Sequence, residues 1–178
     1  MKVEKETHPY IVANLIQKHN VKLFAEIGVK DCIMFEFVMR QIGPEIREYW
    51  AIDRWEAPAH KDRNQYRWEK RHEVACQLMT YYPTLRVLRA HAIQAARLVR
   101  DGYFDAIFLD TSHEYNRTKN EILAWIPKVK KGGIFAGHDF DTHTGMYHGG
   151  VKKAVREVWG EDFDLVPDGA FGTFVKYL

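Results

Sequence analysis

Short apolar segments that resemble buried strands alternate with helical segments along this chain, and this alternation constrains its fold more than any other feature. Parallel strands are usually buried on both faces, and each needs a crossover, commonly a helix, before the next. Strand-like runs lie at residues 21–27, 49–53, 85–90, 104–110 and 133–139. The alternation therefore predicts an α/β fold with a doubly wound, mostly parallel sheet.

The end of the chain departs from this alternation. Helical spacing predicts helices at residues 8–19, 32–42, 65–79, 92–100, 116–125 and 151–159. No helix is expected between the last two strand-like runs, near 163–166 and 171–177, which flank the turn sequence Pro167-Asp168-Gly169. Proline, aspartate and glycine favour tight turns, so we expect an antiparallel hairpin there.

Length and composition indicate one globular domain that covers residues 1–178. The 178 residues, 46% of them hydrophobic, are enough for one substantial core. A net charge of +2 argues against nucleic-acid binding, and no apolar run approaches the roughly 20 residues that span a bilayer. Two distant cysteines, Cys32 and Cys76, with no secretory signal before them, favour a cytoplasmic protein with reduced thiols.

Two of the strand-like runs, about thirty residues apart, stop at a carboxylate. They are FDAIFLD, which ends at Asp110, and GIFAGHD, which ends at Asp139. Since parallel strands open onto a site at their carboxyl ends, we expect the two aspartates to lie side by side, with His113 and His138 next to them. This is the make-up of a metal or acid–base site. The alternative is that both aspartates cap the following helices and the histidines face solvent.

The residue types in this cluster indicate its chemistry. Carboxylates suit Mg²⁺ and leave room for a substrate oxygen, and a histidine ligand extends the choice to Mn²⁺, Fe²⁺ or Zn²⁺. An unperturbed histidine titrates near neutrality, so His113 suits the deprotonation of a hydroxyl. His143 and His148 lie on a glycine-rich loop, and we expect them at the surface rather than among the ligands.

A second group of residues lies at the ends of the first two strands. Glu26-Ile27-Gly28 joins the first strand to the next predicted helix. A glycine there lets backbone approach a ligand and the helix N-terminus offers free N–H groups, although the glycine could simply turn the chain. Asp53 ends the next strand and could accept hydrogen bonds from both ribose hydroxyls of a nucleoside, or act as a helix cap or a surface ion pair. Lys30 and Cys32 stand where a dinucleotide fingerprint would have glycines.

Several of these segments resemble the class I S-adenosylmethionine-dependent methyltransferases, in particular the group that includes the macrocin-type sugar O-methyltransferases. The segments are AEIGVKD (25–31), AID (51–53), FDAIFLDTSHEYNRTKNEILAWIPKVKKGGIFAGHDF (104–140) and GVKKAV (150–155). The resemblance covers roughly residues 20–178. It implies a seven-stranded, Rossmann-like sheet with a reversed last strand and a methyl donor bound across the first strands.

The resemblance also implies roles for individual residues. Glu26, Gly28, Asp53, Ala92 and Asp110 would contact S-adenosylmethionine, with Asp53 on the ribose and Ala92 near the adenine. Asp110, His138 and Asp139 would hold a divalent metal, Mg²⁺ or Mn²⁺. His113 stands where the catechol type has a lysine that acts as base. The chain departs from the family at His138, where a carboxylate is usual, and at Lys30 and Cys32, which replace common glycines.

The leading hypothesis is therefore metal-assisted O-methylation of a small hydroxylated acceptor, a sugar or an aromatic compound. One alternative is a non-catalytic module that binds a nucleoside or S-adenosylmethionine. Another is a nicotinamide-dependent oxidoreductase, against which the missing glycine fingerprint argues. Segment 54–83 is the expected lid, whose aromatic residues either wall the acceptor pocket, pack the helix onto the domain or form a homodimer face; they are Trp55, Tyr66, Trp68, Tyr81 and Tyr82.

Overall fold

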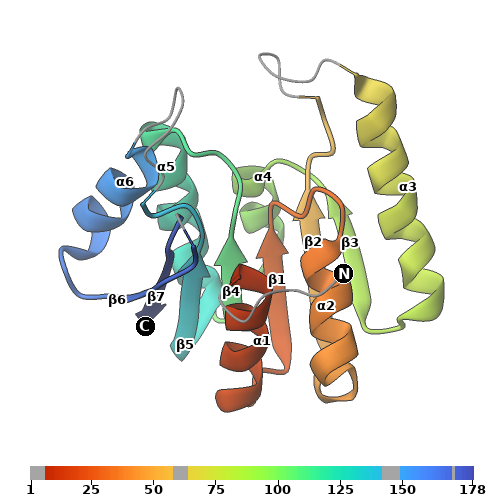
Figure 1. Ribbon diagram of the computed structural model, residues 1–178, viewed down its shortest axis with the longest axis horizontal. Helices are drawn as coiled ribbons and strands as arrows, with labels where there is room; N and C mark the ends of the chain where they lie inside the picture. The colour runs from red at the N-terminus through yellow and green to blue at the C-terminus, as the bar shows by residue number, and fades with distance from the viewer. Residues whose placement is uncertain (1–6, 58–63, 142–148, 170) are drawn as a thin grey trace.

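A computed structural model describes residues 7–57, 64–141, 149–169 and 171–178, and it contains every helix and strand that the sequence predicts (Figure 1). The helices are α1 (His8–Lys18), α2 (Ile33–Ile42), η1 (Gly43–Glu45), α3 (Gln65–Tyr81), α4 (Ala92–Leu98), α5 (Tyr115–Trp125), η2 (Ile126–Lys128) and α6 (Gly150–Trp159), where η marks a 3₁₀ helix. The strands are β1 (Leu23–Ile27), β2 (Glu48–Asp53), β3 (Leu85–Arg89), β4 (Phe104–Leu109), β5 (Val129–Gly137), β6 (Asp164–Val166) and β7 (Thr173–Tyr177).

The seven strands form one sheet in the order β3-β2-β1-β4-β5-β7-β6. Strands β1 to β5 are parallel, whereas β7 runs antiparallel to both β5 and β6. The predicted doubly wound sheet with a reversed C-terminal strand is confirmed. The strand order reverses between β1 and β4, and in such sheets the crevice at this switch point is where ligands bind.

Helices cover both faces of the sheet and make a three-layer molecule (Figure 1). Helices α1, α2 and α3 pack on one face with Phe24 and Phe108 of the central strands. Helices α4, α5 and α6 pack on the other face with Ala25, Ile27 and Ile107. Successive residues of a strand point to opposite faces, so β1 and β4 are apolar on both faces because both are covered.

Strand β5 differs from its prediction at both ends. It covers Val129–Gly137 rather than residues 133–139. It starts earlier because exposed Lys130, Lys131 and Gly132 hide its beginning in the sequence. It ends earlier because Asp139 has a φ of +61°, a left-handed conformation that turns the chain out of the sheet.

The aromatic residues of the predicted lid differ in burial. Trp55 is fully buried, and Trp68 and Tyr82 pack against the core. Tyr66 and Tyr81 are 68% and 77% exposed. Three of the five thus make packing contacts with the core, and the role of segment 54–83 as a lid stays a prediction. Residues 58–63 lie outside the described part of the chain.

Two smaller expectations can be compared with the described residues. Both cysteines are free thiols, with Cys32 buried and Cys76 half-buried. Within the described ranges, none of the helices has the length and the apolar character needed to cross a membrane.

Candidate active site

The carboxyl ends of β1, β4 and β5 lie side by side, and hydrogen bonds continue across the residues that follow them. The Gly28 N–H donates to the carbonyl of Ile52 at 2.8 Å, and the Asp110 N–H donates to the carbonyl of Ile27 at 2.8 Å. The His138 N–H donates to the carbonyl of Leu109 at 3.1 Å. Gly28, Asp110 and His138 therefore form one row along the edge of the sheet, at the switch point.

The structure brings Asp110, His138 and Asp139 together. Nδ1 of His138 lies 3.2 Å from an oxygen of Asp139 and 3.9 Å from an oxygen of Asp110. One ligand atom from each residue lies within 4.8 Å of the other two. Two carboxylates and one imidazole nitrogen can hold Mn²⁺, Fe²⁺ or Zn²⁺ as well as Mg²⁺, so the residues fit the predicted metal.

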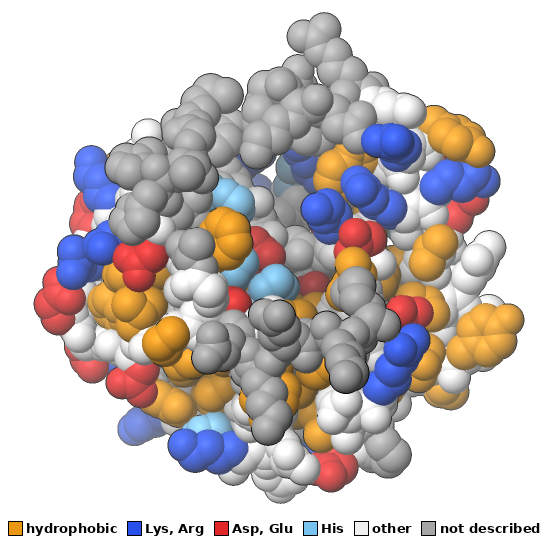
Figure 2. Space-filling view, in the orientation of Figure 1, with side chains coloured by type: hydrophobic (Ala, Val, Ile, Leu, Met, Phe, Trp, Pro, Cys, Tyr) orange, Lys and Arg blue, Asp and Glu red, His pale blue; other side chains and the backbone are white. Residues whose placement is uncertain are grey.

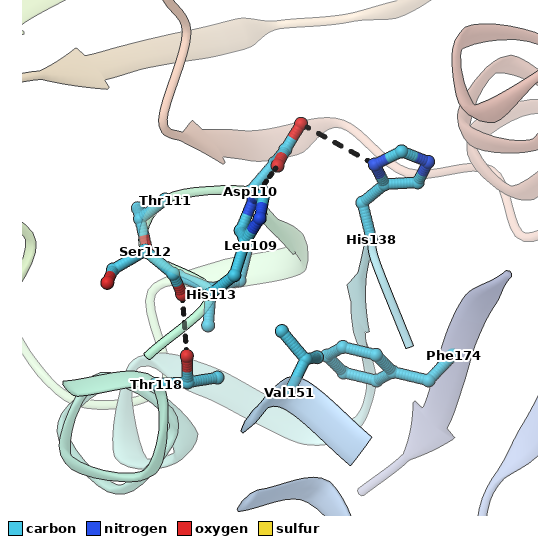
Figure 3. Close-up of a pocket in the computed structure, with 9 residues that line it drawn as sticks. All are labelled: Leu109, Asp110, Thr111, Ser112, His113, Thr118, His138, Val151 and Phe174. Carbon is cyan, nitrogen blue, oxygen red and sulfur yellow. Dashed lines mark hydrogen bonds and ion pairs between the residues drawn. The ribbon is translucent and has the colours of Figure 1, made fainter. Parts of the chain in front are cut away.

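His113 joins this cluster from the loop after β4. Its Nε2 lies 2.8 Å from Asp139. The same nitrogen lies 3.8 Å from Asp110 (Figure 3). Two helices hold the loop in place. The Thr118 hydroxyl of α5 donates to the Ser112 carbonyl at 2.6 Å, and Gly150 of α6 lies so close to the His113 carbonyl that a Cβ atom there would collide with it. Residues far away in sequence thus position the imidazole.

The charges in this cluster shift its pKa values. Hydrogen bonds to Asp110 and Asp139 raise the pKa of His113 to about 9. Burial alone would raise the pKa of Asp139, but the two histidines lower it well below its usual range. The assumption that His113 titrates near neutrality is therefore wrong for the protein without a cation, because the two carboxylates hold its proton.

Thr111 and Glu121 support this loop, and the sequence analysis missed both. The Thr111 hydroxyl donates a hydrogen bond to the Glu121 carboxylate of α5. Glu121 is buried, and this burial raises its pKa to about 7. The helical spacing of α5 places Glu121 on the buried face next to Ile122 and Trp125, which is the signal that could have identified it.

A small pocket opens between this loop and the ends of β4, β5 and β7 (Figure 3). Its lining residues are Leu109, Asp110, Thr111, Ser112, His113, Thr118, His138, Val151 and Phe174. Figure 2 shows histidine and acidic side chains gathered near the middle of the same side of the molecule. The polar part of the pocket is therefore the cluster itself, and its lower wall is apolar.

The loop between β1 and α2 keeps a glycine-type backbone with few glycines. Gly28 has a φ of +97°, and a Cβ atom there would collide with the carbonyl of Asp110. Lys30 and Cys32 have φ angles of +58° and +62°. These two residues adopt the left-handed conformation that glycine adopts freely. The loop therefore has the left-handed backbone conformations typical of glycine although lysine and cysteine occupy these two positions.

Asp53 joins this loop to the end of β2. One of its oxygens accepts from the Lys30 N–H at 2.9 Å, and the other accepts from the Trp55 N–H at 2.7 Å. The Trp55 indole N–H in turn donates to the Lys30 carbonyl at 3.0 Å. The described contacts of Asp53 are thus neither a helix cap nor a surface ion pair. Each carboxylate oxygen has a second lone pair, so ribose contact stays an open prediction.

Glu26 and Ala92, two of the predicted donor contacts, are both buried. Glu26 is 3% exposed, and its carboxylate accepts a hydrogen bond from the Tyr49 hydroxyl at 2.6 Å. Burial raises the pKa of Glu26 well above its usual value. Ala92 starts α4, and its carbonyl accepts from the Trp125 indole at 3.0 Å. Their donor contacts stay predictions, and the contacts seen are internal.

Two residues that the sequence analysis did not select stand beside His138. The His8 ring centre lies 4.3 Å from that of His138, and Asp168 lies 3.0 Å from Nε2 of His138. His8 begins α1, and Asp168 belongs to the turn between β6 and β7. No sequence pattern links positions 8, 138 and 168. His143 and His148 lie outside the described residues.

Comparison with known proteins gives one family and a set of similar folds. Residues 26–140 match the model of a family described as a methyltransferase domain. No curated protein matches the sequence.

Three similar solved structures illustrate the fold. A proposed O-methyltransferase from Klebsiella pneumoniae shares 14% identity at a TM-score of 0.68, covering 100% of this chain and 81% of that one. A proposed caffeoyl-CoA O-methyltransferase from Staphylococcus aureus shares 15% sequence identity at a TM-score of 0.62, and the match covers 94% of this chain and 80% of that one. Spermidine synthase from Thermotoga maritima shares 18% sequence identity at a TM-score of 0.64, and the match covers 99% of this chain and 61% of that one. Identities this low show a common fold and leave the reaction to the site.

Proposed function

The chain belongs to the methyltransferase-domain family and has the class I, S-adenosylmethionine-dependent fold, and on that basis we propose that it methylates a hydroxyl oxygen of a small acceptor with the help of a divalent cation. One observation carries the finer part of this proposal. Asp110, His138 and Asp139 converge within 4.8 Å at the switch point, directly beside the loop that Gly28 begins. The proposed cation site and the proposed nucleoside site would therefore be adjacent.

On the donor side, the proposal assigns ribose binding to Asp53 and close backbone approach to Gly28. S-adenosylmethionine supplies a methyl group on a sulfonium, which becomes a thioether when an oxygen takes the methyl. Asp53 already holds the β1–α2 loop through the Lys30 N–H at 2.9 Å. A loop that is fixed before the donor arrives reduces the ordering that binding requires.

On the acceptor side, the proposal assigns cation binding to Asp110, His138 and Asp139 and proton removal to His113. A divalent cation there would lower the pKa of an acceptor hydroxyl. His113 is protonated at neutral pH while both carboxylates hold its proton, since its pKa is about 9. With a cation on Asp110 and Asp139, the two carboxylates would hold the His113 proton less firmly. His113 would release that proton to solvent, and its neutral Nε2 would then accept the proton of the acceptor hydroxyl.

The experiment has a binding part and a transfer part. Calorimetry with S-adenosylmethionine tests the donor site, and Asp53→Asn should weaken binding because one ribose-facing oxygen is lost. Transfer of a labelled methyl group to panels of sugars and catechols, with and without Mg²⁺ or Mn²⁺, tests the reaction. His113→Gln should lower kcat by about 10²- to 10⁴-fold. The matched control is His19→Gln, an exposed histidine at the far end of α1.

The outcomes separate the hypotheses. No donor binding at millimolar concentration would exclude the proposed function. An affinity for S-adenosylmethionine that changes neither with added metal nor with Asp110→Asn, without methyl transfer to any acceptor, would favour the non-catalytic module. The matched control for Asp110 is Asp101→Asn, an exposed aspartate paired with Lys128. The acceptor class, the homodimer and the cytoplasmic location remain predictions.

A further inference from the structure

We propose a second metal site, formed by His8, His138 and Asp168, that binds a transition metal such as Zn²⁺ or Co²⁺. The three residues come from the start of α1, the end of β5 and the turn between β6 and β7. One ligand atom from each lies within 4.8 Å of the other two. This proposal does not depend on methyl transfer.

The distances are compatible with ligands of one ion. Asp168 Oδ2 lies 3.0 Å from His138 Nε2 and 3.7 Å from His8 Nδ1. Ligands about 2.1 Å from a common ion are separated by about 3.0 to 3.4 Å; this range includes the His138 distance, and the His8 distance is slightly longer. The longer distance exceeds a hydrogen bond, so His8 has a position here that direct bonding to Asp168 does not explain.

The free nitrogen of His138 provides the second, independent observation. Nε2 is buried and has no hydrogen-bond partner among the described residues, although Asp168 is within range, so the direction of the contact is wrong for a hydrogen bond. A buried polar atom without a partner is costly and calls for an explanation. Figure 3 shows that this nitrogen points away from Asp110, on the opposite side of the ring from Nδ1. An ion on that side would satisfy it.

The surroundings of Asp168 also favour a cation. Its side chain is 6% exposed, and the Thr173 hydroxyl donates to it at 3.2 Å. Among the described ion pairs, its partners are the two histidines and no lysine or arginine. A buried carboxylate needs a compensating charge. His8 is 31% exposed, which leaves the site open to an entering ion.

The ligand set favours a different kind of ion from the set around Asp110. Two imidazoles and one carboxylate suit Zn²⁺, Fe²⁺ or Co²⁺, whereas a set richer in carboxylates suits Mg²⁺ and Mn²⁺. His138 belongs to both sets. A neutral imidazole has one lone pair and one N–H, so His138 can serve one ion through Nε2 or the other through Nδ1, but not both at once.

Titration of the chelator-treated protein with Co²⁺ tests the proposal, with visible absorption reporting the coordination and calorimetry giving the Kd. His8→Ala and Asp168→Asn should each weaken Co²⁺ binding at least about tenfold, the smallest loss expected for residues around a metal. Asp110→Asn should change the Kd by less than about twofold, well under that smallest loss. The matched control is His19→Ala, an exposed histidine that caps the C-terminus of the helix that His8 begins.

The His8 variant distinguishes this metal site from the alternative in which Asp168 only orients His138. If Asp168 only orients His138 toward an ion held by Asp110 and Asp139, His8→Ala would leave the Kd unchanged and Asp110→Asn would raise it; either result overturns the proposal. Metal-free unfolding curves of each variant check that it folds. His8→Gln serves if the alanine variant does not, because it keeps the size of the side chain and removes the imidazole.

Discussion

Replacement of Glu121 by glutamine should stabilise the protein above pH 7 and leave it nearly unchanged below pH 4.5. Glu121 is 4% exposed and lies under the loop that carries Asp110 and His113, where it accepts a hydrogen bond from Thr111. Burial raises its pKa from 4.5 to about 7. Glutamine keeps the accepting oxygen for Thr111 and cannot ionise.

The sign and size follow from that pKa. Below pH 4.5 the carboxyl is protonated in both the folded and the unfolded chain, so it adds no pH dependence. Between pH 4.5 and 7 the unfolded chain releases the proton first, and the free energy of unfolding falls as pH rises. At 1.36 kcal/mol per unit, the loss is about 3 kcal/mol above pH 7.

Urea unfolding of both proteins at intervals from pH 4.5 to 9 measures this effect. The advantage of Glu121→Gln should grow by about 3 kcal/mol up to pH 7 and then level off. Glu157→Gln is the contrasting control, since Lys119 and Tyr115 lower the pKa of Glu157 and its loss should destabilise the protein at neutral pH. Parallel curves for wild type and Glu121→Gln would show that the pKa of Glu121 is not raised in the folded protein.

Three further substitutions probe the two loops of the site by denaturant unfolding. Lys30→Gly should stabilise the protein by about 0.5 to 1 kcal/mol, because glycine relieves a φ of +58° at some entropic cost; destabilisation would contradict the left-handed assignment. Gly150→Ala should cost about 1 to 3 kcal/mol, because the methyl group meets the His113 carbonyl, and no loss would mean that the loop is not packed there. Tyr49→Phe should cost about 1 to 3 kcal/mol, because Glu26 loses its O–H donor; a neutral result would place that donor elsewhere.

The sequence predicted the architecture because each central strand is a short apolar run bounded by polar residues. Burial on both faces requires such runs, and β1 and β4 meet the requirement clearly. The start of β5 was not predicted because a polar stretch that includes Lys130 interrupts the apolar run. The strand begins before this stretch, at Val129, which pairs with Phe104. Lys130 faces Asp105 as an ion pair at 2.7 Å, so this part of the strand is held by charge as well as by apolar packing.

The candidate site was predictable only where the sheet itself brings residues together. Asp110 and Asp139 follow neighbouring parallel strands, so topology alone places them near each other. His8 and Asp168 reach the site from opposite ends of the chain, and no local pattern encodes that meeting. The raised pKa of His113 depends on distances to two carboxylates, which a sequence does not contain.

A crystal structure with S-adenosylhomocysteine and Mn²⁺ would show whether the cation and the nucleoside bind where the proposed mechanism requires. We expect anomalous density for manganese between Asp110, His138 and Asp139, with the ribose of the ligand on Asp53. Clear density for the nucleoside with no manganese at those three residues would contradict the metal-assisted mechanism. A nucleoside bound away from Gly28 and Asp53 would contradict the donor site as well.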